Sequence, residues 1–130
     1  MRAFWKRATV NECGEHQIMN EKPGSAGPIF FEHWDDASGN PAGGVTFGNG
    51  FCISWQNGPL GRGTERKAAN GAFVEDIIEA TIARIEFYQS GKFASEYNRE
   101  ALKDLRDALR HLKERTGNRE SRGVEGTHAA

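Results

Sequence analysis

Hydrophobic residues in the second half of the chain recur every three or four positions, which is the period of an α-helix. One stripe of this spacing comprises Val74, Ile77, Ile78, Thr81, Ile82, Ile85 and Tyr88. A second stripe comprises Ala101, Leu102, Leu105, Ala108, Leu109 and Leu112. The pattern predicts helices over Phe73–Gln89 and Ser95–Thr116. Because the connection Ser90–Ala94 is short, we expect the two helices to be antiparallel neighbours.

Four residues indicate where these helices begin and end. Asn70 is the predicted N-cap of the first helix and Ser95 that of the second. Gly91 is placed to end the first helix in the left-handed conformation that glycine tolerates. Gly117 lowers helix stability by about 1 kcal/mol relative to alanine. An end of the second helix before that glycine, near residue 116, is therefore expected.

The first half of the chain has the short apolar runs and the turn residues of β-structure. Residues 28–33, 44–47 and 51–55 are candidate strands. The Asn49-Gly50 dipeptide between the last two runs predicts a β-hairpin. Arg2–Val10 is a candidate edge strand.

These elements predict an α+β fold. A small N-terminal antiparallel β unit precedes a two-helix antiparallel hairpin that oligomerises, because neither part has a large core of its own. The predicted domains are a β-rich unit over residues 1–63, a helical hairpin domain over 70–122 and an extended tail over 123–130.

The charge of the chain is balanced overall but uneven along its length. The net charge is −1 over 130 residues, which argues against a general nucleic-acid binder. Between Arg99 and Arg122, eight basic and five acidic residues give 8 − 5 = +3. No apolar run has the length of a signal peptide or a membrane span. We therefore expect a soluble, cytoplasmic protein, with no nucleic-acid polymer and no membrane as partner.

Aromatic, amide and guanidinium groups lie at the ends of the predicted helices. Tyr88 offers a flat ring to a purine, and Asn98 offers a donor and an acceptor to a base edge or a ribose hydroxyl. Arg115 and Arg119 share a face if the helix continues, and two guanidinium groups suit a pyrophosphate. Arg62, in a glycine-rich loop, could close over the same ligand; Arg66 is a weaker candidate.

The spacing of these residues predicts a dimer. Arg115 and Arg119 are roughly 25–30 Å along the helix from Asn98 at a rise of 1.5 Å per residue. One helical hairpin therefore cannot bring all four groups to one small ligand. An antiparallel two-fold dimer can, and it creates two equivalent pockets.

Taken one at a time, these residues also have structural explanations. Tyr88 could be a core aromatic at a helix end, Asn98 a surface or capping residue, and the arginines a solvated helix end favoured by the helix dipole. Cys13, His16, His33 and Cys52 do not have the spacing of a zinc finger. We predict no metal site, no cofactor and no catalytic residue.

Four motifs occur in the order that is typical of one known family. They are Ser54-Trp-Gln-Asn-Gly-Pro-Leu60, Asn70-Gly-Ala-Phe-Val-Glu-Asp76, Phe87-Tyr-Gln-Ser-Gly-Lys-Phe-Ala94 and the run from Arg115 to Thr127. Over about residues 54–128 the chain resembles the phage hairpin-domain family of anti-Thoeris and anti-CBASS nucleotide sponges. The preceding β unit is similar to the anti-Thoeris branch. The chain departs from the family at Ser95, where cysteine is common, and at His111, where tryptophan is common.

The resemblance implies a dimer, or a hexamer built as a trimer of dimers, that sequesters a cyclic signalling nucleotide without cleaving it. The implied ligand is glycocyclic ADP-ribose, with cyclic di- and trinucleotides as further candidates. The implied ligand-binding residues are Tyr88, Asn98, Arg115 and Arg119. Two other functions stay open on the residues alone. One is a cyclic-nucleotide phosphodiesterase that uses His111 and His128, and the other is an adaptor whose helical hairpin binds a host protein.

Overall fold

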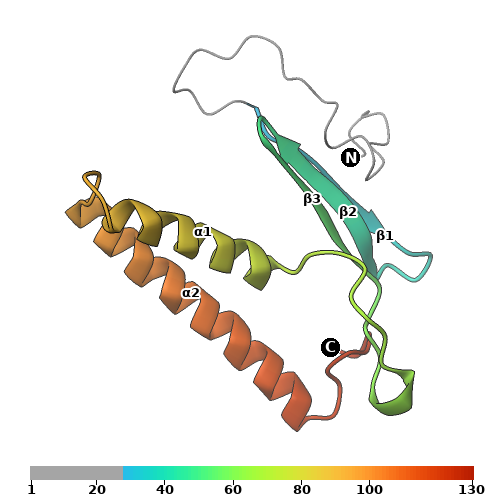
Figure 1. Ribbon diagram of the computed structural model, residues 1–130. Helices are drawn as coiled ribbons and strands as arrows, with labels where there is room; N and C mark the ends of the chain where they lie inside the picture. The colour runs from blue at the N-terminus through green and yellow to red at the C-terminus, as the bar shows by residue number, and fades with distance from the viewer. Residues whose placement is uncertain (1–27) are drawn as a thin grey trace. The chain divides into compact units, whose positions relative to one another are not determined.

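The computed structural model describes residues 28–130, which form two compact units. The first unit holds the described residues up to Leu60 together with Lys67–Ala72, and the second holds Gly61–Arg66 and Phe73–Ala130. Three strands are followed along the chain by two helices (Figure 1). The α+β fold predicted from the sequence is therefore confirmed. The candidate strand Arg2–Val10 lies outside the described residues.

An antiparallel sheet forms the first unit. Its strands are β1 (Phe30–Asp35), β2 (Pro41–Gly48) and β3 (Phe51–Asn57), with β2 in the centre. In the Asn49-Gly50 turn, Gly50 has a φ of 84°, a left-handed conformation that costs glycine nothing. The predicted β-hairpin is confirmed, and Val45 pairs with Ser54 across it.

The segment that leads to the first helix is attached to strand β3. Asn70 accepts a hydrogen bond from the backbone N–H of Asn57 at 2.8 Å through Oδ1, and donates to the Asn57 carbonyl at 2.9 Å through Nδ2. Ala72 forms a parallel bridge with Trp55. The prediction that Asn70 caps the first helix is therefore wrong, because its amide is used by the strand.

Two antiparallel helices, α1 (Val74–Gln89) and α2 (Glu96–Ser121), form the helical hairpin of the second unit (Figure 1). At the start of α1, the N-cap is Phe73, whose N–H donates to Asp76 Oδ2 at 2.7 Å. Ser95 caps α2 as predicted, since its Oγ accepts from the Asn98 N–H at 3.1 Å. Neither described helix is long and apolar enough to cross a membrane.

The ends of both helices differ from the sequence-based expectation. Gly91 is not among the glycines of positive φ in the described part of the chain, so its predicted left-handed stop is wrong. Ser90 is instead the C-cap of α1, in right-handed helical conformation, and donates from its N–H to the Glu86 carbonyl. The second helix passes through Gly117 and ends at Ser121. In its last turn, Ser121 Oγ donates to the Gly117 carbonyl at 3.0 Å.

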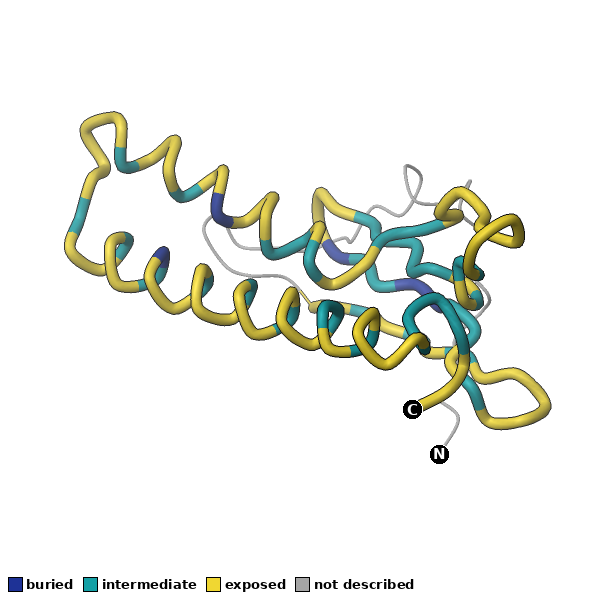
Figure 2. The backbone as a smooth tube through the Cα atoms, turned by 90° about the horizontal axis from the view of Figure 1, so that it is seen from below, coloured by how far each residue is buried: buried dark blue, intermediate teal, exposed yellow. Residues whose placement is uncertain are grey.

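The contact between the helices is narrow. Among the described residues of the helical hairpin, the buried hydrophobic side chains are Ile82 and Leu102, which are 9% and 6% exposed. Figure 2 shows exposed residues along most of both helices. Val74 is 50% exposed although it belongs to the apolar stripe. The two helices therefore leave part of that stripe uncovered.

Ion pairs between the helices join acidic residues of α1 to basic residues of α2. The pairs are Glu75–Arg115 at 3.0 Å, Glu79–Lys113 at 3.1 Å and Glu86–Arg106 at 2.6 Å. Most of these side chains are at least half exposed. Exposed pairs contribute at most about 1 kcal/mol each. Their main effect is to fix the register of the antiparallel helices.

The buried position Leu102 provides a direct test of this packing. We expect Leu102→Ala to lower the free energy of unfolding of the helical hairpin by about 2–4 kcal/mol, because it removes buried methyl groups and leaves a cavity. Urea denaturation followed by circular dichroism at 222 nm measures this, since both helices dominate that signal. Lys103→Ala, at the exposed neighbouring position of α2, is the control and should change the midpoint little. Equal midpoints for the two variants would contradict the packing described.

Candidate ligand-binding site

Two of the site residues predicted from the sequence lie on the helix ends beside the turn between α1 and α2. Tyr88 is the second-last residue of α1 and is 37% exposed. Asn98 lies in the first turn of α2, where its Nδ2 donates to the Phe93 carbonyl at 3.1 Å. Gln89 joins the two helix ends, because its Oε1 accepts from the Ser95 N–H at 2.8 Å and its Nε2 donates to the Ser95 carbonyl at 3.1 Å. The structure therefore brings Tyr88 and Asn98 to one end of the helical hairpin.

A further basic residue contacts this aromatic ring. The Nε of Arg84 donates to the Tyr88 hydroxyl at 3.1 Å, and its guanidinium lies over the rings of both Tyr88 and Phe87. The sequence analysis did not single out Arg84. The signal was available, since a basic residue four positions before a tyrosine on a helix lies on the same face.

Charges on the other helix at this end are paired. Arg99 forms ion pairs with Glu96 and Glu100. Its hydrogen bond lowers the pKa of the Glu96 carboxyl, against an opposing effect of desolvation. Both side chains are well exposed, so the pair contributes little to stability. The charge of Arg99 is therefore balanced within the helix.

The arginines at the far end of α2 are also engaged. Arg115 donates from Nη2 to Glu75 Oε1 at 3.0 Å, yet its side chain remains 60% exposed. Arg119 is half-buried and donates to the carbonyls of Val124 at 3.0 Å, Thr127 at 3.1 Å and Ala129 at 2.8 Å. Three of its five N–H groups thus hold the C-terminal tail, which leaves at most two for a ligand.

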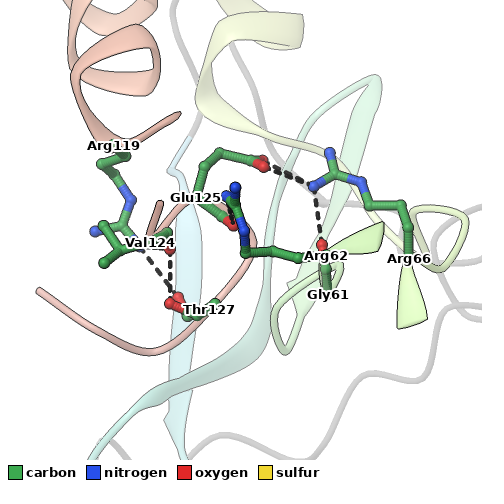
Figure 3. A network of polar contacts seen from close by, with 7 residues as sticks. All are labelled: Gly61, Arg62, Arg66, Arg119, Val124, Glu125 and Thr127. Atoms are coloured by element: carbon green, nitrogen blue, oxygen red, sulfur yellow. Dashed lines mark hydrogen bonds and ion pairs between the residues drawn. The ribbon is translucent and has the colours of Figure 1, made fainter. Parts of the chain in front are cut away.

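The loop Gly61–Arg66 pairs with the tail Val124–Thr127, and we call this arrangement the loop–tail clasp (Figure 3). The Gly61 N–H donates to the Gly126 carbonyl at 2.8 Å. Arg62 donates to the Glu125 carbonyl at 2.9 Å, and Arg66 forms an ion pair with the Glu125 carboxylate at 2.7 Å. Gly126 is required here, because its φ is 77° and a Cβ would lie 2.3 Å from the Gly61 carbonyl oxygen.

The clasp brings Arg62 and Arg119 to the same stretch of tail. Figure 3 shows Arg119 bound to the carbonyls of Val124 and Thr127 while Arg62 approaches Glu125. The sequence analysis nominated both arginines but missed Glu125, the acidic residue that fixes the loop. A single carboxylate inside Gly-Val-Glu-Gly is a weak signal in a sequence, because its partner lies 59 positions away.

Two clusters therefore lie at opposite ends of α2. Tyr88 and Asn98 offer a ring and an amide at one end, and Arg62, Arg115 and Arg119 offer cations at the other. Asn98 and Arg115 are 17 positions apart on one continuous helix, or about 26 Å. In one chain the two clusters do not meet.

Other candidate sites are weaker in the described residues. A shallow groove along α2 is lined by Arg106, Leu109, Arg110, Lys113 and Glu114, none of which was predicted as a site residue. The described part of the chain has no group of three or more metal-ligating side chains. Cys13 and His16 lie outside it.

Comparison with known proteins shows a similarity to one class of phage protein. No family model matches the chain. It is similar to an anti-Thoeris protein, which confirms the resemblance that the motifs indicated. The relative is Thoeris anti-defense 1 of Bacillus phage SBSphiJ7, with 42% identity over 76 residues, or 58% of this chain. The chain spans about half the length of that relative, as the match covers 51% of it.

The Arg66–Glu125 pair is the charged contact of the clasp and can be tested alone. We expect Glu125→Gln to speed hydrogen exchange of the Gly61 N–H by about two- to fivefold, because a half-exposed ion pair contributes up to about 1 kcal/mol. Exchange measured by nuclear magnetic resonance at constant pH gives this rate. Glu120→Gln, at an exposed acidic residue in the last turn of α2, is the control. An unchanged Gly61 rate in Glu125→Gln would show that the carboxylate does not hold the loop.

Proposed function

We propose that the protein is a phage anti-defence sponge that binds a cyclic signalling nucleotide and withholds it from bacterial Thoeris immunity. The similarity to Thoeris anti-defense 1 is the observation that carries this proposal. The proposed ligand is glycocyclic ADP-ribose, and cyclic di- and trinucleotides are further candidates. The site of action would be the cytoplasm of the infected host.

The chemistry of the two clusters suits such a ligand. Tyr88 supplies a stacking surface and Asn98 a side-chain amide for the base or ribose. Arg115, which is 60% exposed, supplies charge-assisted hydrogen bonds to a pyrophosphate. Arg119 and Arg62 act at the same end, and part of their hydrogen-bonding capacity holds the tail.

A dimer would bring the two distant clusters to one small ligand. Two antiparallel copies of the helical hairpin would set the turn of one copy against the arginine end of the other, and would do so twice. The incompletely covered apolar stripe supports this arrangement, because Val74 of that stripe is 50% exposed and the neighbouring N-cap residue Phe73 is 38% exposed. A trimer of such dimers is the hexamer that the resemblance implies.

A sponge requires affinity for the signal and no transition-state complementarity. The alternative hydrolase would use His111 and His128 as acid and base. His111 lies in the middle of α2, 3.9 Å from Glu114 across an exposed i,i+3 pair. His128 lies in the tail, directly after Thr127. The Thr127 carbonyl accepts a hydrogen bond from Arg119, which lies about two turns beyond His111 in α2. The adaptor alternative has no specific observation in its favour.

Titration calorimetry followed by recovery of the ligand tests the proposal. We expect one glycocyclic ADP-ribose to bind per protomer and to be recovered intact by mass spectrometry after the complex is denatured. A linearised product would support the hydrolase instead. No heat with this ligand or with any cyclic di- or trinucleotide would overturn the sponge proposal.

Substitutions at the two clusters test the proposed contacts. Arg115→Ala should weaken binding by about 1.5–3 kcal/mol through loss of charge-assisted hydrogen bonds. Tyr88→Ala should weaken it by about 1–3 kcal/mol through loss of stacking, as aromatic contacts with bases do elsewhere. Tyr88→Phe keeps the ring and is the matched control, with binding within a few-fold of the original. Normal binding by Tyr88→Ala would remove the stacking role.

A further inference from the structure

Arg84 places a cation on the aromatic surface at the turn end of the helical hairpin. Its Cζ lies 5.0 Å from the ring centroid of Phe87 and 5.0 Å from that of Tyr88. The two rings are 61% and 37% exposed, and they lie 5.9 Å apart at an angle of 58°. One guanidinium thus covers aromatic surface that would otherwise face water.

Arg84 differs from four of the five arginines of α2, and the fifth, Arg119, is bound to carbonyls of the tail. The arginines at positions 99, 106, 110 and 115 all form ion pairs with carboxylates. No such pair involves Arg84 within residues 28–130. Its contacts are the two ring faces and the Tyr88 hydroxyl. An exposed cation–π contact is weak, about two- to fivefold in an equilibrium, so a ligand can displace it.

We infer that Arg84 makes this aromatic pair selective for phosphorylated nucleotides over neutral nucleosides. A base that stacks on the covered ring face takes the place of the guanidinium, which remains tethered beside it. With a nucleoside, the guanidinium exchanges its ring contacts for water. With a nucleotide, it gains charge-assisted hydrogen bonds to a phosphate, which are stronger than the contacts that it leaves.

This inference rests on the proposed function, because it takes Tyr88 as the stacking residue. It adds a cation at the turn end that belongs to the same helix as the ring. The preference for a phosphate would then arise at both ends of the pocket, from Arg84 beside the stacked nucleobase and from Arg115 at the opposite end. Arg84 would be a specificity-determining residue and not a support for the fold, since its side chain is exposed.

The test compares adenosine with adenosine 5′-diphosphate on the full chain. Ring resonances of Phe87 and Tyr88 are followed by nuclear magnetic resonance at fixed ionic strength during titration with each compound. We expect Arg84→Ala to lower the ratio of the adenosine Kd to the diphosphate Kd about tenfold, mainly by weakening the diphosphate. Adenosine should bind equally well or up to about fivefold more tightly, because it no longer displaces a cation.

Two further variants separate charge from structure. Arg84→Lys keeps the charge and should restore part of the preference for the diphosphate. Arg110→Ala removes one positive charge from α2, where that residue pairs with Glu114, and should leave the ratio unchanged. The inference is overturned if Arg84→Ala weakens both compounds equally, leaves the ratio unchanged, or lowers it no more than Arg110→Ala does.

Failure of this inference is distinguishable from failure of the proposed function. If the unaltered protein binds glycocyclic ADP-ribose by calorimetry and the ratio does not respond to Arg84→Ala, only the role of Arg84 is wrong. If the unaltered protein binds no cyclic nucleotide and neither adenosine compound, both are wrong.

Discussion

The continuity of α2 sets the distance between the two clusters of candidate ligand-binding groups. The helix runs without a break from Glu96 to Ser121, through Gly117. Its length keeps Asn98 and Arg115 about 26 Å apart. It also carries Arg119 to the point where the guanidinium can hold the tail. A break at Gly117 would separate Arg119 from Arg115 and release the tail.

The tail gives Arg119 a structural role beside its proposed binding role. Because Arg119 holds three tail carbonyls, its replacement would disturb Glu125 and hence the Gly61–Arg66 loop. Arg115 has no such link to the tail among its described contacts and pairs with Glu75 on α1. Loss of binding in an Arg115 variant is therefore the clearer sign of a ligand contact. Arg62 shares the ambiguity of Arg119, since it donates to the Glu125 carbonyl.

Local periodicity predicted the elements of this chain, whereas a contact between distant residues determined the residues that precede α1. The stripes around Ile82 and Leu102 predicted both helices, and Asn49-Gly50 predicted the β-hairpin. The expected cap at Asn70 was wrong because strand β3 binds that amide from 13 positions away. Residue types and their spacing were enough to predict the candidate ligand-binding residues. They could not predict the loop–tail clasp, because its ion pair joins Arg66 and Glu125, which are 59 positions apart. Arg84 was not predicted, although its position four residues before Tyr88 places both side chains on one face of α1.

A mixture of two defective variants tests most directly whether one pocket is built from two protomers. Tyr88→Ala and Arg115→Glu each remove a different end of the proposed pocket, and each is expected to bind glycocyclic ADP-ribose too weakly to detect at the chosen concentration. Coexpression should form mixed dimers as about half of all dimers, and each mixed dimer has one intact pocket out of two. About one quarter of the binding capacity should therefore return. No recovery of binding in coexpressed variants, despite mixed dimers shown by mass spectrometry, would contradict a pocket shared between protomers.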